Sequence, residues 1–415
     1  MALMWRAFAL VLSFVTVLFI SRNFSATELG VFTLVQSILM IMISIGRFGL
    51  HQSMIKRVAV NRARENYKGI RKDYQNAVVI AILVSMLVVG GYFLLVPFLS
   101  ARFLPELEGS LYLMAIGLSV FLLVWRDINV ASLRGLKKIS VSVFLEQASI
   151  HLFTLVFLLL IYFSVGKEDS ILNAYFLAIA TAFVFSQIFW YRASQEGDPS
   201  VGRHDFSRRA LVKLSFPMLL ASSLLMLNQW MDSIMLGYFA DEETVGLYNV
   251  ALRISNLVMI PLFAVNATIA PRFAEEHEKG QNLQHTVTQA SKMIFLLSLP
   301  IVIVLWLGGR YALGIFGEEY TDSYWPLVFL LIGQAVNVFA GSVMNLLQMT
   351  GFEKLGNRIV LVSTLVNIVL NVLLIPFLGA VGAAIATGVS LAVWNILGLI
   401  YVWKRLQIRS FYWPF

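Results

Sequence analysis

The sequence predicts an all-α polytopic membrane protein with twelve transmembrane helices in two six-helix bundles. Three observations lead to this prediction: the composition, the length of the apolar runs and an internal repeat. Of the 415 residues, 59% are hydrophobic and only 13% are charged, and the mean hydropathy is +0.80. Soluble domains hold about 25% charged residues, so this chain is too poor in charge to cover a water-exposed surface.

Twelve apolar runs are long enough to cross a bilayer, because a hydrocarbon core of about 30 Å requires roughly 20 residues per helix. Cysteine is absent, which excludes disulfides and thiolate metal sites. We expect the spans at approximately 2–20, 30–50, 76–98, 111–132, 143–164, 171–191, 214–237, 246–270, 291–308, 325–348, 359–376 and 383–403.

The charged residues between the spans predict the topology. Loops that follow odd-numbered spans hold 4 Lys and Arg residues and 11 Asp and Glu residues, whereas the other loops and the C-terminal tail are rich in Lys and Arg. Because cytoplasmic loops carry the basic excess, we expect both termini in the cytoplasm. The net charge of +8 follows from this topology and does not indicate a nucleic-acid partner.

The chain repeats itself at an offset of 216 residues, which aligns Asn23–Phe32 with Phe239–Tyr248 and Gly135 with Gly351. Six spans per half is an even number. The halves are therefore expected to share one orientation, related by a pseudo-twofold axis along the membrane normal. Transporters built from such parallel repeats bind their substrate between the halves.

The repeat also predicts the domain organisation. A polar stretch with glycine and proline separates the two halves. We expect an N-terminal six-helix bundle at 1–191, a cytoplasmic linker at 192–213, a C-terminal six-helix bundle at 214–403 and a cytoplasmic tail at 404–415.

The second half carries a set of short motifs, which begin at Asp232 (DSIMLGYF), Val245 (VGLYNVALRI), Ala270 (AP), Ile315 (IFGEEY) and Leu378 (LGAVGAAIAT). Together they resemble the multidrug/oligosaccharidyl-lipid/polysaccharide exporter (MOP) superfamily, and within it the Wzx-type polysaccharide flippases. The resemblance implies a MATE-like fold, alternating access and a bacterial inner-membrane location. It also implies a cargo on polyprenyl pyrophosphate, such as an O-antigen repeat unit of lipopolysaccharide.

The resemblance further implies which partners the protein has. These are the lipid-linked oligosaccharide and membrane lipids, together with the glycan polymerase and glycosyltransferases of the same pathway. We expect a monomer without a cofactor, coupled to Na⁺ or to protons.

Four arginines fall inside the predicted spans, where a charge costs roughly 2.5–3.5 kcal/mol on insertion scales, so each predicts a polar cavity. Relatives in the superfamily place a cavity-facing arginine at the position of Arg253, and a guanidinium holds pyrophosphate through a planar fork. We expect the same role for Arg47, Arg6 and Arg126. Alternatively, Arg253 snorkels to the interface and Arg47 marks a cytoplasmic helix end. Arg126, which we expect not to face its neighbour Asp127, would then contact another helix.

A second group of polar residues predicts a coupling-ion site. Asp232, Asn371 and Thr387 each lie five residues from the outer end of a span, and Asn367 lies one turn deeper than Asn371 on the same face. Their oxygens suit a hard cation such as Na⁺. Lipid flippases of the superfamily have a cation site with ligands at similar spacing, and this resemblance implies that the carbonyl of Ala383 is a further ligand. At the position of Asn371, those flippases can carry a second carboxylate. Alternatively, Asp232 alone carries a proton, or the polar groups only join helices.

His151 and Glu146 lie on the fifth predicted span, and the repeat aligns His151 with Asn367. Because imidazole titrates near neutral pH, these residues are a second candidate for proton coupling. The alternative is a pair of polar groups that are satisfied inside the bundle.

Three functions remain open. We favour an ion-coupled flippase for lipid-linked oligosaccharide. A drug or toxin exporter of the same superfamily is the alternative. A membrane glycosyltransferase or polymerase needs catalytic groups on large outer loops, whereas the longest outer loop here, 309–324, has about 16 residues. The inner loops lack an Asp-x-Asp metal motif and the chain lacks a Gly-rich phosphate loop, so we expect no enzyme.

Overall fold

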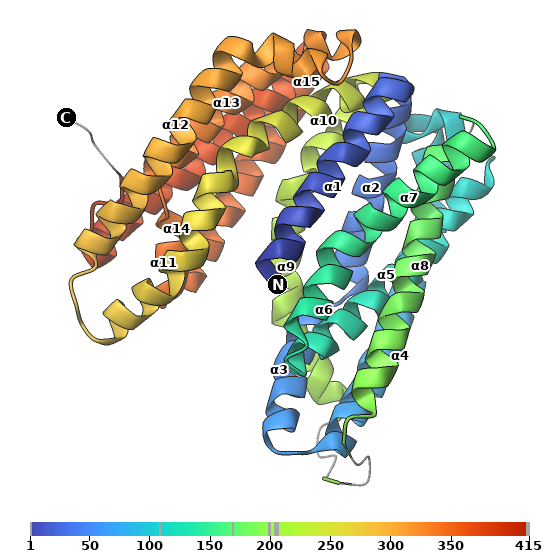
Figure 1. Cartoon of the computed structure of the whole chain (residues 1–415), viewed down its shortest axis with the longest axis vertical. Helices are drawn as coiled ribbons and strands as arrows, with labels where there is room; N and C mark the ends of the chain where they lie inside the picture. Colours follow the sequence, from blue (N-terminus) through green and yellow to red (C-terminus); the bar gives the residue numbers. More distant parts are fainter. Residues whose placement is uncertain (1, 108, 168–169, 198–200, 203–206, 412–415) are drawn as a thin grey trace. The chain divides into compact units, whose positions relative to one another are not determined.

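The computed structural model describes residues 2–107, 109–167, 170–197, 201–202 and 207–411 (Figure 1). Over these residues the regular structure is helical, with no strand, as the sequence predicts. Residues 198–200 and 203–206 of the predicted linker, and 412–415 of the predicted tail, lie outside the described residues.

The helices of the first half begin with α1 and end with α8. Their bounds are α1 (Ala2–Asn23), α2 (Ala26–Gly46), α3 (Leu50–Ala63), α4 (Tyr67–Phe103), η1 (Pro105–Leu107), α5 (Leu111–Gly135), α6 (Ile139–Val143), the π-helical turn η2 (Phe144–Ala148), α7 (Ser149–Ser164) and α8 (Ser170–Ser194).

The second half runs from α9 to α15. Its helices are α9 (Arg208–Phe239), α10 (Glu242–Asn256), η3 (Leu257–Met259), α11 (Ile260–Glu278), α12 (Gln284–Gly314), η4 (Glu318–Ser323), α13 (Tyr324–Ala340), α14 (Val343–Met349) and α15 (Glu353–Leu406).

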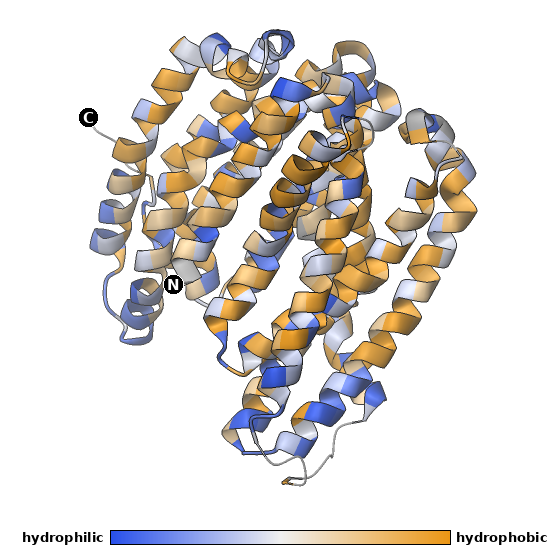
Figure 2. Ribbon diagram, turned by 45° about the vertical axis from the view of Figure 1, so that its right-hand side comes forward, coloured by the Kyte–Doolittle hydropathy of each residue, from blue (hydrophilic) through white to orange (hydrophobic). Residues whose placement is uncertain are grey.

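Ten helical segments of the described chain are long and apolar enough to cross a membrane. Apolar residues run along most helices and hydrophilic residues gather at their ends (Figure 2). Large apolar side chains point outward, among them Leu94, Phe163 and Leu307, each more than 75% exposed. Such outward apolar surface suits lipid, where each backbone polar group must be satisfied within the helix. The chain is therefore a multi-pass membrane protein.

The last two predicted spans both lie in α15, which is a pair of helices joined at Gly379, where the backbone leaves helical geometry (φ 52°, ψ −129°). The two parts fold back on one another. Ser363 Oγ donates to the carbonyl of Ser390 at 2.9 Å, and a Cβ on Gly382 would lie 2.6 Å from the carbonyl of Leu374. The two parts of α15 thus cover the spans predicted at 359–376 and 383–403.

Two predicted spans differ from the structure at their C-terminal ends. The span predicted at 30–50 stops at Gly46, because Phe48 and Gly49 have positive φ angles of 48° and 68° and turn the chain into α3. A side chain at Gly49 would also meet the carbonyl oxygen of Ser215 at 2.2 Å. The span predicted at 325–348 is divided between α13 and α14 at Gly341, whose φ is 74°.

The contacts divide the chain into two compact units. Unit 1 comprises Met1–Phe24 and Leu34–Trp230, and unit 2 comprises Ser25–Thr33 and Met231–Phe415. The start of α2 thus belongs with the second half, and the first part of α9 belongs with the first half. The boundaries that the sequence predicts, at 191 and 214, stay a prediction.

Within unit 2, the starts of α2 and α10 cross at two glycines that the repeat aligns. A Cβ on Gly30 would lie 1.7 Å from the carbonyl oxygen of Glu242, and a Cβ on Gly246 would lie 2.0 Å from that of Ala26. Ala26 and Glu242 are themselves one repeat apart, so the contact is reciprocal, as at a local two-fold axis. Glycine is required at both positions because the backbones touch.

The same two helices begin with equivalent caps. The backbone N–H of Glu28 donates to Ser25 Oγ at 3.2 Å, and that of Thr244 donates to Asp241 Oδ1 at 2.8 Å. Ser25 and Asp241 are also one repeat apart. A capping side chain satisfies one of the free donors at a helix start, so both helices begin at the same point of the repeat.

We expect Gly30→Ala to lower the midpoint of thermal unfolding, because its Cβ forces α2 away from α10. Overpacking of this kind costs about 1–3 kcal/mol. The matched control is Gly90→Ala in α4, where a Cβ has no neighbour within 4 Å. Alanine there should leave the midpoint unchanged or raise it, since alanine is favoured over glycine in a helix by about 0.5–1 kcal/mol. Equal midpoints for the two variants, measured on purified protein in detergent, would contradict the close crossing.

Candidate functional site

The carboxylate of Asp232, on α9, accepts hydrogen bonds from four side chains of unit 2. Its Oδ1 accepts from Asn371 Nδ2 at 2.7 Å and from Asn367 Nδ2 at 3.1 Å. Its Oδ2 accepts from the hydroxyl of Tyr248 at 2.7 Å and from that of Thr387. We call these five residues the Asp232 cluster. The structure thus brings together the four side chains that the sequence predicts at similar depth in the membrane, which are those of Asp232, Asn367, Asn371 and Thr387.

The four donors come from α10 and from both parts of α15. Asn367 and Asn371 precede the break at Gly379, and Thr387 follows it. All five residues of the cluster are buried or nearly so, with Asp232 only 7% exposed. A buried carboxylate is costly without partners, so these hydrogen bonds compensate its removal from water.

Tyr248 was not predicted as part of this cluster. Its side chain is fully buried, and a buried tyrosine hydroxyl usually finds a hydrogen-bond partner. The sequence carries a signal for it, because Tyr248 lies in the motif that resembles the MOP superfamily and faces a span with a lone acid.

One atom of the cluster is left without a partner in the described chain. Asn371 Oδ1 is buried and accepts no hydrogen bond, whereas Asn367 Oδ1 accepts from Asn371 Nδ2 at 3.0 Å. Amide orientations are assigned from the hydrogen-bond network, and a rotated Asn371 would turn its oxygen toward Asp232. Carboxylate, amide and hydroxyl oxygens then converge, which is the ligand type that a hard cation takes. The donor set is therefore of the type that a hard cation such as Na⁺ takes, and the binding of a cation here stays a prediction.

Ala383, the further ligand implied by the resemblance, is fully buried in α15. It lies one turn before Thr387, and the carbonyl of a helical residue points toward the residue four positions later. Its carbonyl is thus directed to the turn that carries Thr387. Its role as a ligand stays a prediction.

Unit 1 holds a group of charged residues near the C-terminal end of α2. Arg47 Nη1 lies 3.2 Å from Asp127 Oδ2, and Arg126 Nε and Nη2 donate to Asp127 Oδ1 at 3.1 and 2.7 Å. The expectation that Arg126 does not face Asp127 is therefore wrong. Although adjacent Cβ atoms on a helix diverge, the guanidinium lies several bonds beyond its Cβ and can turn back to its neighbour.

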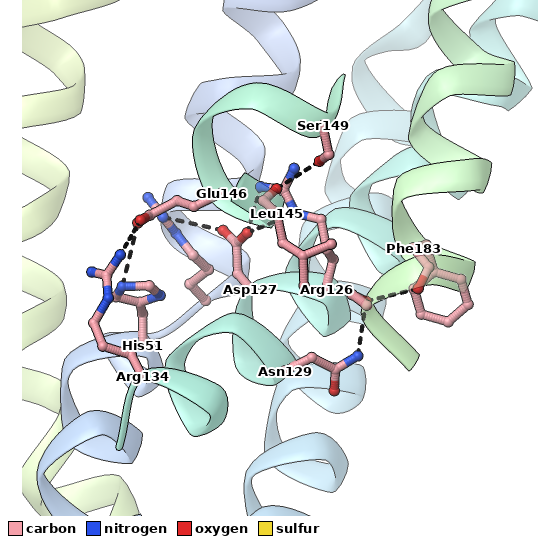
Figure 3. A network of polar contacts seen from close by, with 11 residues as sticks. His51, Arg126, Asp127, Asn129, Arg134, Leu145, Glu146, Ser149 and Phe183 are labelled. Atoms are coloured by element: carbon pink, nitrogen blue, oxygen red, sulfur yellow. Dashed lines mark hydrogen bonds and ion pairs between the residues drawn. The ribbon is translucent and has the colours of Figure 1, made fainter. Parts of the chain in front are cut away.

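A second acid completes this group, which Figure 3 shows from close by. Glu146, on the π-helical turn η2, accepts from Arg134 of α5, and its Oε1 lies 3.7 Å from His51 Nε2. Turns of π-helix are frequent at functional sites. We call Arg47, His51, Arg126, Asp127, Arg134 and Glu146 the ionic cluster; Glu146 was predicted to act with His151, and the structure places it beside His51.

The remaining predicted residues lie outside these two clusters. Arg253 Nε donates to Asn249 Oδ1, four residues earlier on α10, at 2.8 Å. Arg6 is exposed on α1, and His151 is half-buried on α7. The roles of these residues in cargo binding and proton coupling stay predictions.

Comparison with known proteins identifies the family. The pattern of the polysaccharide biosynthesis protein family matches residues 3–277. The chain belongs to this family. The match covers the ionic cluster and, in the Asp232 cluster, Asp232 and Tyr248. The MatE pattern matches residues 217–373 and extends to Asn367 and Asn371.

Curated relatives of this polysaccharide biosynthesis protein include two from Haloferax volcanii. The probable low-salt glycan biosynthesis flippase Agl15 is 26% identical over 418 residues, which cover 97% of this chain and 82% of the relative. The probable flippase AglR is 30% identical over 183 residues, 43% of this chain and 38% of the relative.

Solved structures of transporters share the fold. The inward-closed lipid II flippase MurJ superposes with a TM-score of 0.79 at 13% identity, covering 97% of this chain and 87% of MurJ. An inward-facing multidrug resistance MATE transporter of the MOP superfamily gives a TM-score of 0.77 at 16% identity, covering 96% and 94%. The predicted MATE-like fold is confirmed.

We expect Tyr248→Phe to lower the unfolding midpoint, because Asp232 then loses a hydrogen bond to a charged group, worth about 1.5–3 kcal/mol. Tyr320→Phe is the matched control. Tyr320 is equally buried in unit 2, but its hydroxyl has no hydrogen-bond partner among the described residues. Thermal unfolding of both variants in detergent checks the contact, and equal stability of the two would contradict it.

Proposed function

We propose that this protein is a flippase that carries an oligosaccharide on polyprenyl pyrophosphate across the membrane by ion-coupled alternating access. The observation that carries the proposal is the similarity to the probable glycan flippase Agl15 over 97% of the chain. Membership of the polysaccharide biosynthesis protein family supports it. On this proposal the chain performs transport and no covalent chemistry.

Arginines of the spans supply the charge that a pyrophosphate needs. A guanidinium presents a planar pair of donors to phosphate oxygens and stays protonated. Arg47 contacts Asp127 through its Nη1, and 18% of its side chain is exposed. Arg253, Arg6 and Arg126 complete the proposed set of cargo-binding cations.

The Asp232 cluster is the proposed coupling site. Asp232, Asn367, Asn371, Thr387 and the carbonyl of Ala383 would hold Na⁺, which supplies a fixed positive charge to the buried carboxylate. The hydroxyl of Tyr248 also points at this carboxylate. Because the donors come from α10 and both parts of α15, a change at the carboxylate alters contacts between several helices. A proton on Asp232 is the alternative coupling ion.

The second candidate function is export of drugs or toxins, which the likeness to a multidrug resistance transporter favours. The two functions differ in cargo charge: a pyrophosphate is anionic, and a site for it requires a net positive charge. We propose further that the protein works as a monomer in a bacterial inner membrane, with both termini cytoplasmic. Its proposed partners are the glycan polymerase and glycosyltransferases.

We expect Arg253→Ala to abolish export of the surface glycan while the protein remains in the membrane, and Arg253→Lys to retain part of it. Arg310→Ala is the control, because Arg310 stacks on Tyr324 in the second half and has no proposed role in cargo binding. Surface glycan and membrane-bound protein are measured in the deletion strain that expresses each variant. Normal glycan from Arg253→Ala would remove the proposed role. Intact glycan in the deletion strain, with higher sensitivity to cationic dyes, would favour the drug exporter.

Asp232→Asn should abolish the response of flipping to a Na⁺ or proton gradient, since the neutral amide cannot bind the ion. Flipping of a labelled polyprenyl diphosphate is measured in proteoliposomes with each gradient in turn. Asp322→Asn, which changes an exposed acid of η4, should behave as the unmodified protein. A gradient response that survives Asp232→Asn would reject the site.

A further inference from the structure

His51, at the start of α3, lies among charged groups from three other elements. Glu146 of η2 is 3.7 Å from its Nε2. Asp127 and Arg134 of α5 and Arg47 of the turn after α2 are the other charges that act on the imidazole. The contacts form two sets, Arg47 with Asp127 and Glu146 with both His51 and Arg134 (Figure 3). Electrostatic interactions of the imidazole with all four charges couple the two sets.

Among the described residues, the side-chain contacts of this turn with α9 involve uncharged groups. Helix α9 meets the first turn of α3 through Ser215 and Met218, which contact Ser53 at 2.8 and 3.3 Å. On α3 itself, Arg57 is paired with Asp73. The charge that His51 experiences is thus set by two carboxylates and two guanidiniums.

The protonation of His51 depends on the balance between these negative and positive charges. Its Nδ1 is buried and has no hydrogen-bond partner in the described chain. Burial lowers its pKa from the ordinary value of 6.5; Asp127 and Glu146 raise the pKa, and Arg47 and Arg134 lower it. The imidazole is therefore mostly neutral at pH 7, and any loss of a nearby cation moves its pKa upward.

We propose that His51 is a proton-binding site that takes up a proton when an anionic headgroup draws Arg47 away from Asp127. The inference rests on the proposed function, because the headgroup is a lipid diphosphate. Arg47 is the accessible member of its pair, with 18% of its side chain exposed against 6% for Asp127. An anion can thus reach the guanidinium, while the carboxylate stays buried and retains its hydrogen bonds from Arg126.

Three changes then favour the imidazolium. The positive charge of Arg47 moves away from His51 toward the headgroup. Asp127 loses one of its two guanidinium partners, so more of its negative charge acts on the imidazole. The diphosphate adds negative charge nearby. The proton comes from water on the side from which the cargo enters. Binding of the two ligands is reciprocal, so protonated His51 in turn raises the affinity for the diphosphate. The affinity therefore increases as the pH falls toward the pKa of His51 in the complex.

The experiment follows the imidazole signals of the full-length protein in nanodiscs by NMR, with ¹⁵N-labelled histidine. The chain has 5 histidines, and the signal of His51 is assigned by its loss in His51→Gln. Undecaprenyl diphosphate is the probe, and undecaprenol, which lacks the charge, is its control. We expect the diphosphate to raise the pKa of His51 by about one pH unit, and undecaprenol to leave it unchanged.

Two variants test the same network without any lipid. Arg47→Gln should raise the pKa of His51, because a repelling cation is lost, and Asp127→Asn should lower it, because a carboxylate is lost. Arg310→Gln, in unit 2, should not move it. A pKa that stays constant in Arg47→Gln, or in the unmodified protein with the diphosphate bound, would overturn the proposal.

The test separates this inference from the proposed function. If the protein flips labelled polyprenyl diphosphate in proteoliposomes but His51→Gln leaves the pH profile of flipping unchanged, only the role of His51 is rejected. If no diphosphate binds and nothing is flipped, the proposed function fails together with the ligand-linked proton uptake.

Discussion

The loss of hydration of a carboxylate that is buried in an apolar helical protein must be compensated by groups of the protein itself. Asp232 accepts hydrogen bonds from four side chains, which provide this compensation. The donors come from α10 and from both sides of the break in α15. The two parts of α15 are therefore joined near the break at Gly379 by a hydrogen-bonded carboxylate as well as by apolar packing. Removal of one partner leaves charge uncompensated, whereas removal of apolar surface leaves only a cavity. This difference makes the carboxylate a constraint on three helices at once.

The two clusters solve the cost of buried charge in different ways. The Asp232 cluster surrounds one anion with neutral donors, so any cation that binds there meets an unpaired charge. The ionic cluster instead pairs charges with each other: Asp127 contacts two guanidiniums, and Glu146 contacts a third. Breaking a buried ion pair by removal of one partner is costly, so an anionic ligand that competes for Arg47 must supply equivalent interactions. A diphosphate has enough oxygens to do so.

Sequence reasoning succeeded where a physical property is periodic or additive along the chain. The apolar runs predict the spans, and equal depth in the membrane correctly grouped Asp232 with Asn371 and Thr387. Sequence reasoning failed where a contact depends on the reach of a long side chain or where a turn sets the end of a helix. Arg126 reaches its neighbour because the guanidinium is far from its Cβ, and the positive φ at Phe48 redirects the end of α2. His51 was missed because its partner Glu146 is far away in the sequence, and Tyr248 was missed although it lies in a motif of the second half, because that motif does not show which residue its hydroxyl contacts.

The duplicated scaffold carries chemistry that is not duplicated. One repeat earlier, Asp232 and Tyr248 correspond to Thr16 and Phe32; one repeat later, Arg47 and Asp127 correspond to Phe263 and Val343. The glycines at the crossing of α2 and α10 have been retained in both copies, while the charged groups have been kept in one copy or the other. The backbone contact is thus present in both copies of the repeat, whereas each charged cluster lies in one half of the chain only.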